Sequence, residues 1–141
     1  GENIVVCGGG STGCDGALEI ASEMNKNVTI IEMKDSCAED AMFINRISLM
    51  NALAENNVTM ITQAKVTKID ETGVLIEKAD GSTEKVAADT VINAFGMKPV
   101  LTTVNSIKEK YHTKTRLLGD SNKIGKIGDA IRDGFYAGSA I

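Results

Sequence analysis

The spacing of apolar residues predicts alternating strands and helices at the start of the chain. Residues 4–7 and 28–31 are short, nearly continuous apolar runs, as in strands buried on both faces of a parallel sheet. Between them, apolar residues recur at helical spacing from residue 14 to residue 24. This order predicts a right-handed βαβ unit, with an amphipathic helix packed on the sheet.

The pattern continues with a second helix and a third strand. Ser36 and Glu39 have the spacing of a capping box, which predicts that a helix begins there. One helix face is then marked by Phe43, Ile44, Ile47, Met50, Leu53 and Ala54. Residues 58–61 read as a third parallel strand, which completes a βαβαβ half.

From residue 64 to residue 87 the pattern changes to short β-prone runs. Residues 66–69, 74–76 and 83–86 are separated by turn-forming residues, which predicts a three-stranded antiparallel meander. Residues 89–96 then read as a strand that returns to the main sheet. We therefore expect an α/β fold of three layers, with a central parallel sheet and the meander as a crossover.

The rest of the chain has weaker patterns. Residues 101–110 fit a short helix after Pro99, the only proline, and residues 115–118 fit a last short strand. Apolar residues from Ile124 to Gly138 mark a closing helix.

Composition narrows the classes of function. The 141 residues carry a net charge of −4, which argues against nucleic acid or an anionic membrane as the main partner. There is no apolar run of about 18 residues. The three cysteines form no C-x-x-C pair, so we expect neither a disulfide framework nor a metal site, and a cytoplasmic location fits best.

Glycines follow the first predicted strand in a pattern that indicates phosphate binding. Gly8, Gly10 and Gly13 have the G-x-G-x-x-G spacing, in which the first glycine makes a tight turn, the second admits a pyrophosphate and the third allows close helix packing. The phosphates would lie at the helix N-terminus. Candidate cofactor contacts there are Gly8, Gly9, Gly10, Ser11, Thr12, Gly13 and Asp15. Asp15 is explained almost as well as an exposed first-turn acid favoured by the helix dipole.

An acidic residue follows the second strand at the distance expected for a dinucleotide site. Glu32 lies 32 − 13 = 19 positions after Gly13, where a dinucleotide fold places the carboxylate that binds the adenosine ribose. A Rossmann-like site is therefore predicted, with NAD(H) favoured over its 2′-phosphorylated form. Met33 and Lys34 are further candidates, although Lys34 weakens the argument for that preference.

Other candidates lie where strands meet the expected cofactor edge of the sheet. Ala94, Phe95 and Gly96 end the predicted strand 89–96, and ligands of open α/β sheets pass the carboxyl ends of strands. Ala64 and Val66, at the start of the meander, complete the set. Gly96 has the alternative reading of an ordinary strand-to-loop glycine.

The segments 6–17, 28–32, 89–99 and 118–141 together resemble a known family. They are similar to the pyridine-nucleotide domain of the pyridine nucleotide-disulfide oxidoreductase superfamily, whose domains have the FAD/NAD(P)-binding fold. Within it, the chain looks most like the NADH-binding part of the old-yellow-enzyme-like NADH:flavin oxidoreductases, which include 2,4-dienoyl-CoA reductase and 2-enoate reductase.

The resemblance implies a role within a longer enzyme. Residues 1–114 would bind NAD(H), and residues 115–141 would be a return segment of the FAD-binding domain, packed in the same single domain, with Asp120 near the flavin. Hydride would pass from NADH to FAD, and then through an iron–sulfur cluster to FMN in a barrel domain that reduces an activated C=C bond. FAD, FMN and the cluster would be bound elsewhere, so no catalytic residue is expected here and the isolated chain would be inactive.

Two features depart from the family pattern, and two other functions remain open. Asp15 stands where relatives often have glutamate, and Phe95 where many have a small residue or threonine. The same glycines and acid also suit an FAD-binding Rossmann domain, and a non-enzymatic NAD-sensing module is the third reading.

Overall fold

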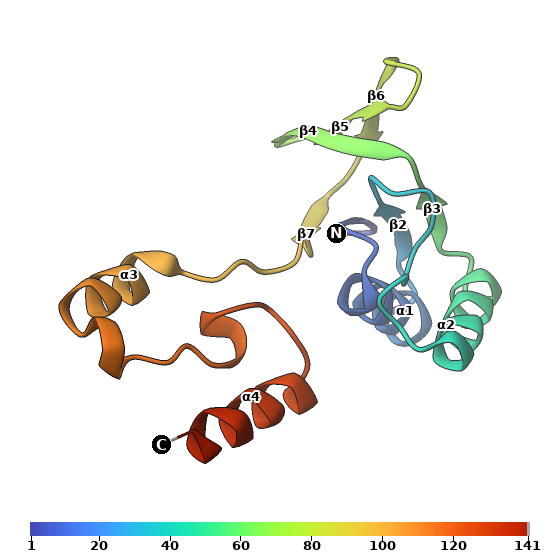
Figure 1. Ribbon diagram of the computed structural model, residues 1–141. Helices are drawn as coiled ribbons and strands as arrows, with labels where there is room; N and C mark the ends of the chain where they lie inside the picture. Colours follow the sequence, from blue (N-terminus) through green and yellow to red (C-terminus); the bar gives the residue numbers. More distant parts are fainter. Residues whose placement is uncertain (141) are drawn as a thin grey trace. The chain divides into compact units, whose positions relative to one another are not determined.

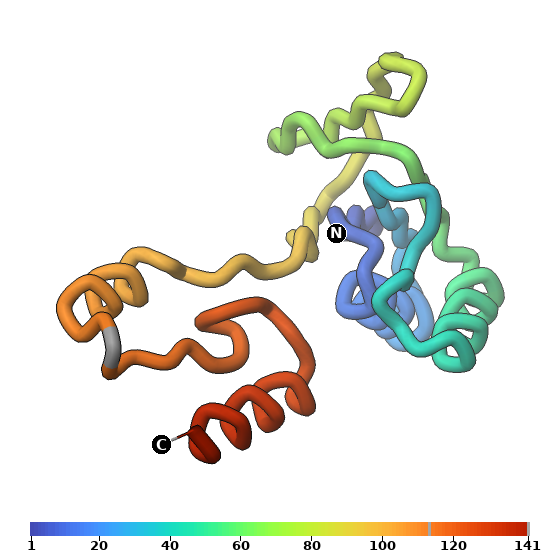
Figure 2. Tube along the Cα trace, in the orientation of Figure 1, coloured from blue at the N-terminus to red at the C-terminus, as the bar shows by residue number. Residues whose placement is uncertain are grey.

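The computed structural model of the chain describes residues 1–140, apart from the side chain of Thr113, and contains two compact units. The first unit is Gly1–Gly96 and holds both sheets, and the second begins at Met97 (Figure 2). The division expected after residue 114 stays a prediction, because it concerns a return to a flavin domain, which the fold of these residues does not test.

A four-stranded parallel sheet forms the centre of the first unit. Its strands are β1 (Asn3–Cys7), β2 (Asn27–Ile31), β3 (Thr59–Ile61) and β7 (Thr90–Asn93), in the order β3-β2-β1-β7. β1 is paired on both sides, with Val6 opposite Ile30 of β2 and Ile92 of β7. The parallel sheet expected from the apolar runs is confirmed.

One face of this sheet is covered by two helices, α1 (Ser11–Met24) and α2 (Phe43–Glu55) (Figure 1). Val6 and Ile30 point to this face and are buried against Ala17 of α1 and Leu53 of α2. Burial of these side chains is the main force that holds the helices on the sheet.

The other face is covered by the meander, whose strands are β4 (Ala64–Asp70), β5 (Gly73–Lys78) and β6 (Thr83–Ala87). They form a separate antiparallel sheet in the order β4-β5-β6. Val5 and Ile31 alternate with the helix-facing residues of their strands and pack against Val74 and Ile76 of β5. Helices, parallel sheet and meander are the three predicted layers, so the fold class is confirmed.

The predicted start of the second helix is wrong. α2 begins at Phe43, and Ser36 donates its hydroxyl hydrogen bond to Glu39 Oε1, 2.8 Å away, within a loop. The N–H of Ala38 donates to the carbonyl of Gly9 at 2.7 Å, and the φ of Ala38 is +53°. This long-range bond and the left-handed residue hold residues 32–42 against the glycine turn, so a helix cannot form there.

The second unit contains α3 (Leu101–Lys110) and α4 (Ile127–Ser139), with short 3₁₀ turns at His112–Lys114 and Gly119–Ser121. The predicted strand 115–118 is wrong, because no strand in the described part of the chain pairs with it, and the N–H of Leu118 donates to Ser121 Oγ instead. Neither helix has a buried residue, and the apolar face of α4, which includes Ile131 and Phe135, is exposed. Within residues 1–140, no helix combines the length and the apolar character that crossing a membrane requires.

Candidate functional site

The glycine turn between β1 and α1 lies in close contact with the end of β7. A Cβ on Gly8, whose φ is +115°, would lie 2.2 Å from the carbonyl oxygen of Ala94. A Cβ on Gly13 would lie 2.0 Å from the carbonyl oxygen of Gly8. Both glycines are therefore required by the fold itself, as the motif predicts for its first and third positions.

Gly10 has a different role, because its surroundings are open. It is the N-cap residue of α1, and the nearest atom to a Cβ placed there is Asp40 Oδ1 at 3.7 Å. Its φ of −68° and ψ of 173° are accessible to any residue. Packing thus does not explain the glycine, and the motif predicts instead that a phosphate approaches the backbone here.

Glu32 follows β2 directly and turns its carboxylate back to the glycine turn. Its side chain is largely buried, with 9% of its surface exposed. Oε2 accepts a hydrogen bond from the N–H of Gly9 at 2.6 Å, and Oε1 accepts one from the N–H of Lys34 at 2.9 Å. Each carboxylate oxygen keeps a further lone pair. The carboxylate is therefore held in one orientation and can still accept the hydroxyl groups of a ribose.

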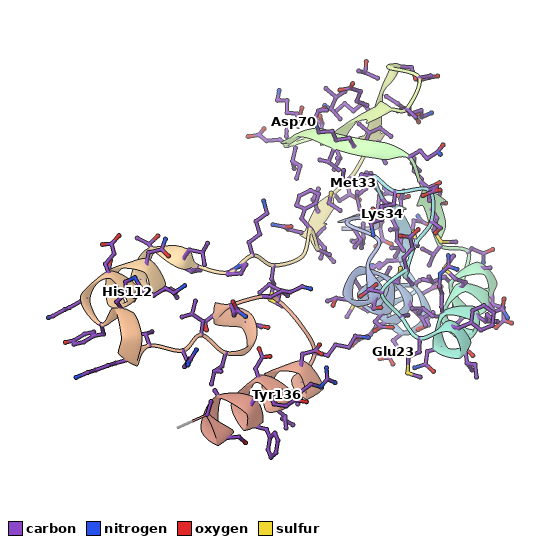
Figure 3. The ribbon with its side chains drawn as sticks, in the orientation of Figure 1. Glu23, Met33, Lys34, Asp70, His112 and Tyr136 are labelled. Carbon is purple, nitrogen blue, oxygen red and sulfur yellow. The ribbon has the colours of Figure 1, made fainter. Side chains whose placement is uncertain are left out.

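A cleft of about 460 Å³ opens beside the turn, entirely within the first unit. Met33 and Lys34, which are labelled in Figure 3 on the loop after β2, are among the residues that line it. The predicted residues that line the cleft are Gly8, Gly9, Gly10, Glu32, Met33, Lys34, Ala64, Val66, Ala94, Phe95 and Gly96. The size of the cleft, its glycine floor and the oriented carboxylate fit a dinucleotide.

Five predicted residues do not line this cleft. Thr12 and Asp15 are exposed on α1, and Gly13 is buried beneath the turn. The N–H of Ser11 donates to Asp40 Oδ1 at 2.8 Å. Asp120 belongs to the second unit, where its Oδ1 accepts a hydrogen bond from the N–H of Gly125 at 3.2 Å.

The cleft also has lining residues that the sequence patterns did not single out as a site: Ile31, Ser36, Glu39, Asp40 and Lys65. Most belong to the loop 32–42, which the capping-box reading assigned to a helix. One signal could have identified these loop residues. β1 and β2 are parallel neighbours, so the loop after β2 leaves the sheet at the same edge as the glycine turn after β1.

Acidic groups of this loop shape the electrostatics of the cleft. Glu39 Oε2 forms an ion pair with Lys34 Nζ at 3.1 Å. The hydroxyl of Ser36, together with Lys34, holds the pKa of Glu39 below its usual range, and Glu39 raises the pKa of Lys34. The Asp40 carboxylate accepts a hydrogen bond from the N–H of Ser11, at the N-terminus of α1, where anions bind favourably. A dinucleotide phosphate would therefore meet the Asp40 carboxylate at this donor.

Comparison with known proteins establishes the family. Residues 1–122 match the family described as pyridine nucleotide-disulphide oxidoreductase. The chain belongs to this family of flavin-dependent oxidoreductases with Rossmann-type dinucleotide-binding folds.

The chain is similar to parts of two longer bacterial enzymes. It is 34% identical over 134 residues to an NADH oxidase from Thermoanaerobacter brockii, covering 95% of this chain and 20% of that one. It is 30% identical to a bilirubin reductase from Mediterraneibacter gnavus, covering 98% of this chain and 21% of the relative. The chain thus spans about a fifth of the length of the relatives it matches.

Solved structures agree with this placement. The whole chain superimposes on 21% of a 2-naphthoyl-CoA reductase with a TM-score of 0.82 and 27% identity. A histamine dehydrogenase from Rhizobium matches 97% of this chain and 22% of its own length with a TM-score of 0.81, and at 16% identity it supports the fold alone.

Proposed function

We propose that the chain binds NADH in the cleft of the first unit and presents it for hydride transfer to FAD held by the rest of a longer enzyme. The observation that carries this proposal is the orientation of Glu32, whose carboxylate is tied to the glycine turn through the N–H of Gly9. A ribose-binding acid and a phosphate-binding turn in direct contact are what dinucleotide recognition requires.

Each group of lining residues has a role in this proposal. Glu32 accepts the hydroxyl groups of the adenosine ribose, and Met33, Ala64 and Val66 provide apolar contact for the adenine. The pyrophosphate passes over Gly9 and Gly10 toward the N-terminus of α1. Ala94, Phe95 and Gly96, at the end of β7, lie beside the nicotinamide half. The cofactors supply the hydride chemistry, and these residues bind and orient.

For the longer enzyme, we propose reduction of an activated C=C bond. The names of matched proteins, such as 2-naphthoyl-CoA reductase and the cinnamate reductase of Clostridium sporogenes, support a reductase. Sites for FAD, FMN and an iron–sulfur cluster would lie in its other domains, including a barrel domain. Such a protein would work in a reducing cytoplasm, which fits the free thiols of Cys7, Cys14 and Cys37 in the structure.

The second unit fits a return to the FAD-binding domain. α4 exposes Ile127, Ile131 and Phe135 on one face, and such a face is stable only when another surface covers it. We assign that surface to the FAD-binding domain, and Asp120 to the flavin side of it.

The test is titration of the purified 141-residue protein with NADH, followed by NADH fluorescence. We expect a colourless protein that binds NADH at a single site, with weaker binding of NADPH. Gly10→Val is the matched control, because it obstructs the phosphate approach without touching Glu32. A yellow protein with bound flavin, or NADH affinity equal in the control, would contradict the proposal.

A further inference from the structure

Two cysteines meet at the glycine turn from different elements. Cys14 lies in the first turn of α1 and Cys37 in the loop 32–42, and both are buried, at 0% and 1% exposure. Cys14 Sγ donates to the carbonyl of Gly9 at 3.4 Å, while Cys37 Sγ would lie 2.7 Å from a Cβ on Gly9. Each of the two thiols also shifts the pKa of the other. Both sulfur atoms thus lie beside Gly9, in the same buried cluster, where the loop meets the start of the helix.

The pKa values of the two thiols differ because the thiols interact with each other. Interaction with the Cys14 thiol lowers the pKa of Cys37, and the positive charge of Arg46 acts in the same direction. Arg46 Nε also donates to the carbonyl of Cys37 at 2.9 Å. Burial and the nearby Glu32 and Glu39 carboxylates oppose the effect without reversing it. The pKa of Cys14 is raised, first by its interaction with Cys37 and then by burial. Cys37 is therefore the thiol that ionises first.

We propose that Cys14 and Cys37 are an oxidisable pair that forms an intrachain disulfide by exchange with a small-molecule disulfide. The Cys37 thiolate attacks one sulfur of the reagent, which releases one thiolate and leaves a mixed disulfide on Cys37. The sulfur of Cys14 then bonds to Cys37 Sγ, and the second reagent thiolate leaves with the proton of Cys14. Two protein thiols are oxidised, and one reagent disulfide is reduced to two thiols.

The disulfide acts on the cleft through the loop that carries Asp40. Asp40 holds the N–H of Ser11 at the α1 N-terminus, and Ala38 donates to Gly9 in the same loop. A covalent bond from Cys37 to α1 fixes this arrangement, so that a phosphate can no longer displace Asp40 from its donor. This regulatory consequence rests on the proposed binding of NADH.

Cys7 is an internal control for the effect of burial. It is also fully buried, at 0% exposure, and burial raises its pKa. Its side chain lies in the opposite core of the sheet, with the meander, whereas Cys14 and Cys37 share the helix-side core. If burial alone governs reactivity, all three cysteines behave alike.

The test exposes the native 141-residue protein to hydroxyethyl disulfide, alkylates the remaining thiols in denaturant, and maps the peptides by mass spectrometry. We expect a Cys14–Cys37 linked peptide that lacks two hydrogen atoms, with Cys7 alkylated, and reversal by a phosphine reductant. Cys7→Ala keeps the linkage, and Cys14→Ala stops at a mixed disulfide on Cys37. Because the wild-type map alone decides, a variant that fails to fold does not affect the result.

Two results would overturn the proposal: alkylation of Cys37 to the same extent as Cys7, or linkage of either cysteine to Cys7 or to a second molecule. NADH titration of the reduced and oxidised forms tests the regulatory consequence, with about tenfold weaker binding expected for the oxidised form. Equal affinities would overturn that consequence. Absence of NADH binding to the reduced protein would instead contradict the proposed function, while the peptide map still decides the cysteine pair.

Discussion

The carboxylate of Glu32 and the backbone N–H of Gly9 form a hydrogen bond of 2.6 Å that joins the end of β2 to the phosphate-binding turn. The same carboxylate accepts the N–H of Lys34, so the turn and the loop after β2 share one acceptor. The residue proposed to bind the ribose therefore also positions the turn proposed to bind the pyrophosphate.

Replacement of Glu32 by alanine removes both of these contributions. We expect Glu32→Ala to weaken NADH binding by about tenfold to a hundredfold, since hydrogen bonds to a charged group contribute about 1.5–3 kcal/mol. The preference for NADH over NADPH narrows, because the carboxylate that repels a 2′-phosphate is gone. Fluorescence titration with both cofactors measures the change. Glu23→Ala, at the far end of α1 (Figure 3), is the control and leaves both affinities unchanged.

The glycines of the turn differ in what they contribute. We expect Gly10→Val to cost at most about 1 kcal/mol of stability, as for an unfavourable N-cap residue, while NADH binding falls at least about tenfold. Gly13→Ala forces a backbone shift, because its Cβ would lie 2.0 Å from the carbonyl of Gly8, and costs more than about 2 kcal/mol. Thermal melts and NADH titrations of both variants check this contrast. A large loss of Tm in Gly10→Val would assign that glycine to the fold.

Removal of the Asp40 charge is expected to strengthen NADH binding, whereas the Glu32 and Gly10 substitutions weaken it. Asp40→Asn keeps an oxygen that can accept the N–H of Ser11 but removes the charge that repels a phosphate, so we expect NADH to bind about threefold to tenfold more tightly. Asp35→Asn is the matched control, since it removes the same charge from the same loop at a residue that does not line the cleft. Weaker binding in Asp40→Asn would show that the carboxylate supports the ligand.

Acid stability depends on Asp89, which joins the start of the chain to β7. Its Oδ2 accepts the N–H groups of Asn3 and Glu2 at 2.8 and 3.0 Å, and these bonds lower its pKa. Because the folded-state pKa lies below the unfolded value of about 3.9, the stabilisation is complete above that pH. It is lost as the pH falls through the folded-state pKa.

Thermal melts at pH 7 and pH 3 test this dependence. We expect Asp89→Asn to have a lower Tm than the wild type at pH 7 and a smaller decrease in Tm toward pH 3. Asp35→Asn, at an exposed carboxylate, keeps the wild-type pH profile. An unchanged profile in Asp89→Asn would mean that other carboxylates govern acid unfolding.

The fold was predictable where the spacing of apolar residues along the sequence reflects which side chains are buried. Val5 and Val6 face different layers, so β1 needs apolar residues at successive positions, and the run 4–7 shows that directly. The strand expected at residues 115–118 fails for the opposite reason. A strand requires a partner, and a short β-prone run contains no information on whether a neighbouring strand is present.

The candidate site was predictable where it depends on fixed spacing. Gly8, Gly10 and Glu32 occupy positions that any dinucleotide turn needs. Asp40 was missed because its approach to Ser11 depends on the path of the loop 32–42, which is set by the contact of Ala38 with Gly9 and not by a local pattern.

The central position of β1 has a consequence for synthesis of the chain. β1 is completed on one side by β2, which follows closely, and on the other only by β7, at residues 90–93. Until a ribosome has released those residues, the nascent chain exposes an apolar strand edge with unpaired N–H and C=O groups, which other chains can pair with. A form of this unit that ends before residue 90 lacks β7 and leaves that edge of β1 unpaired.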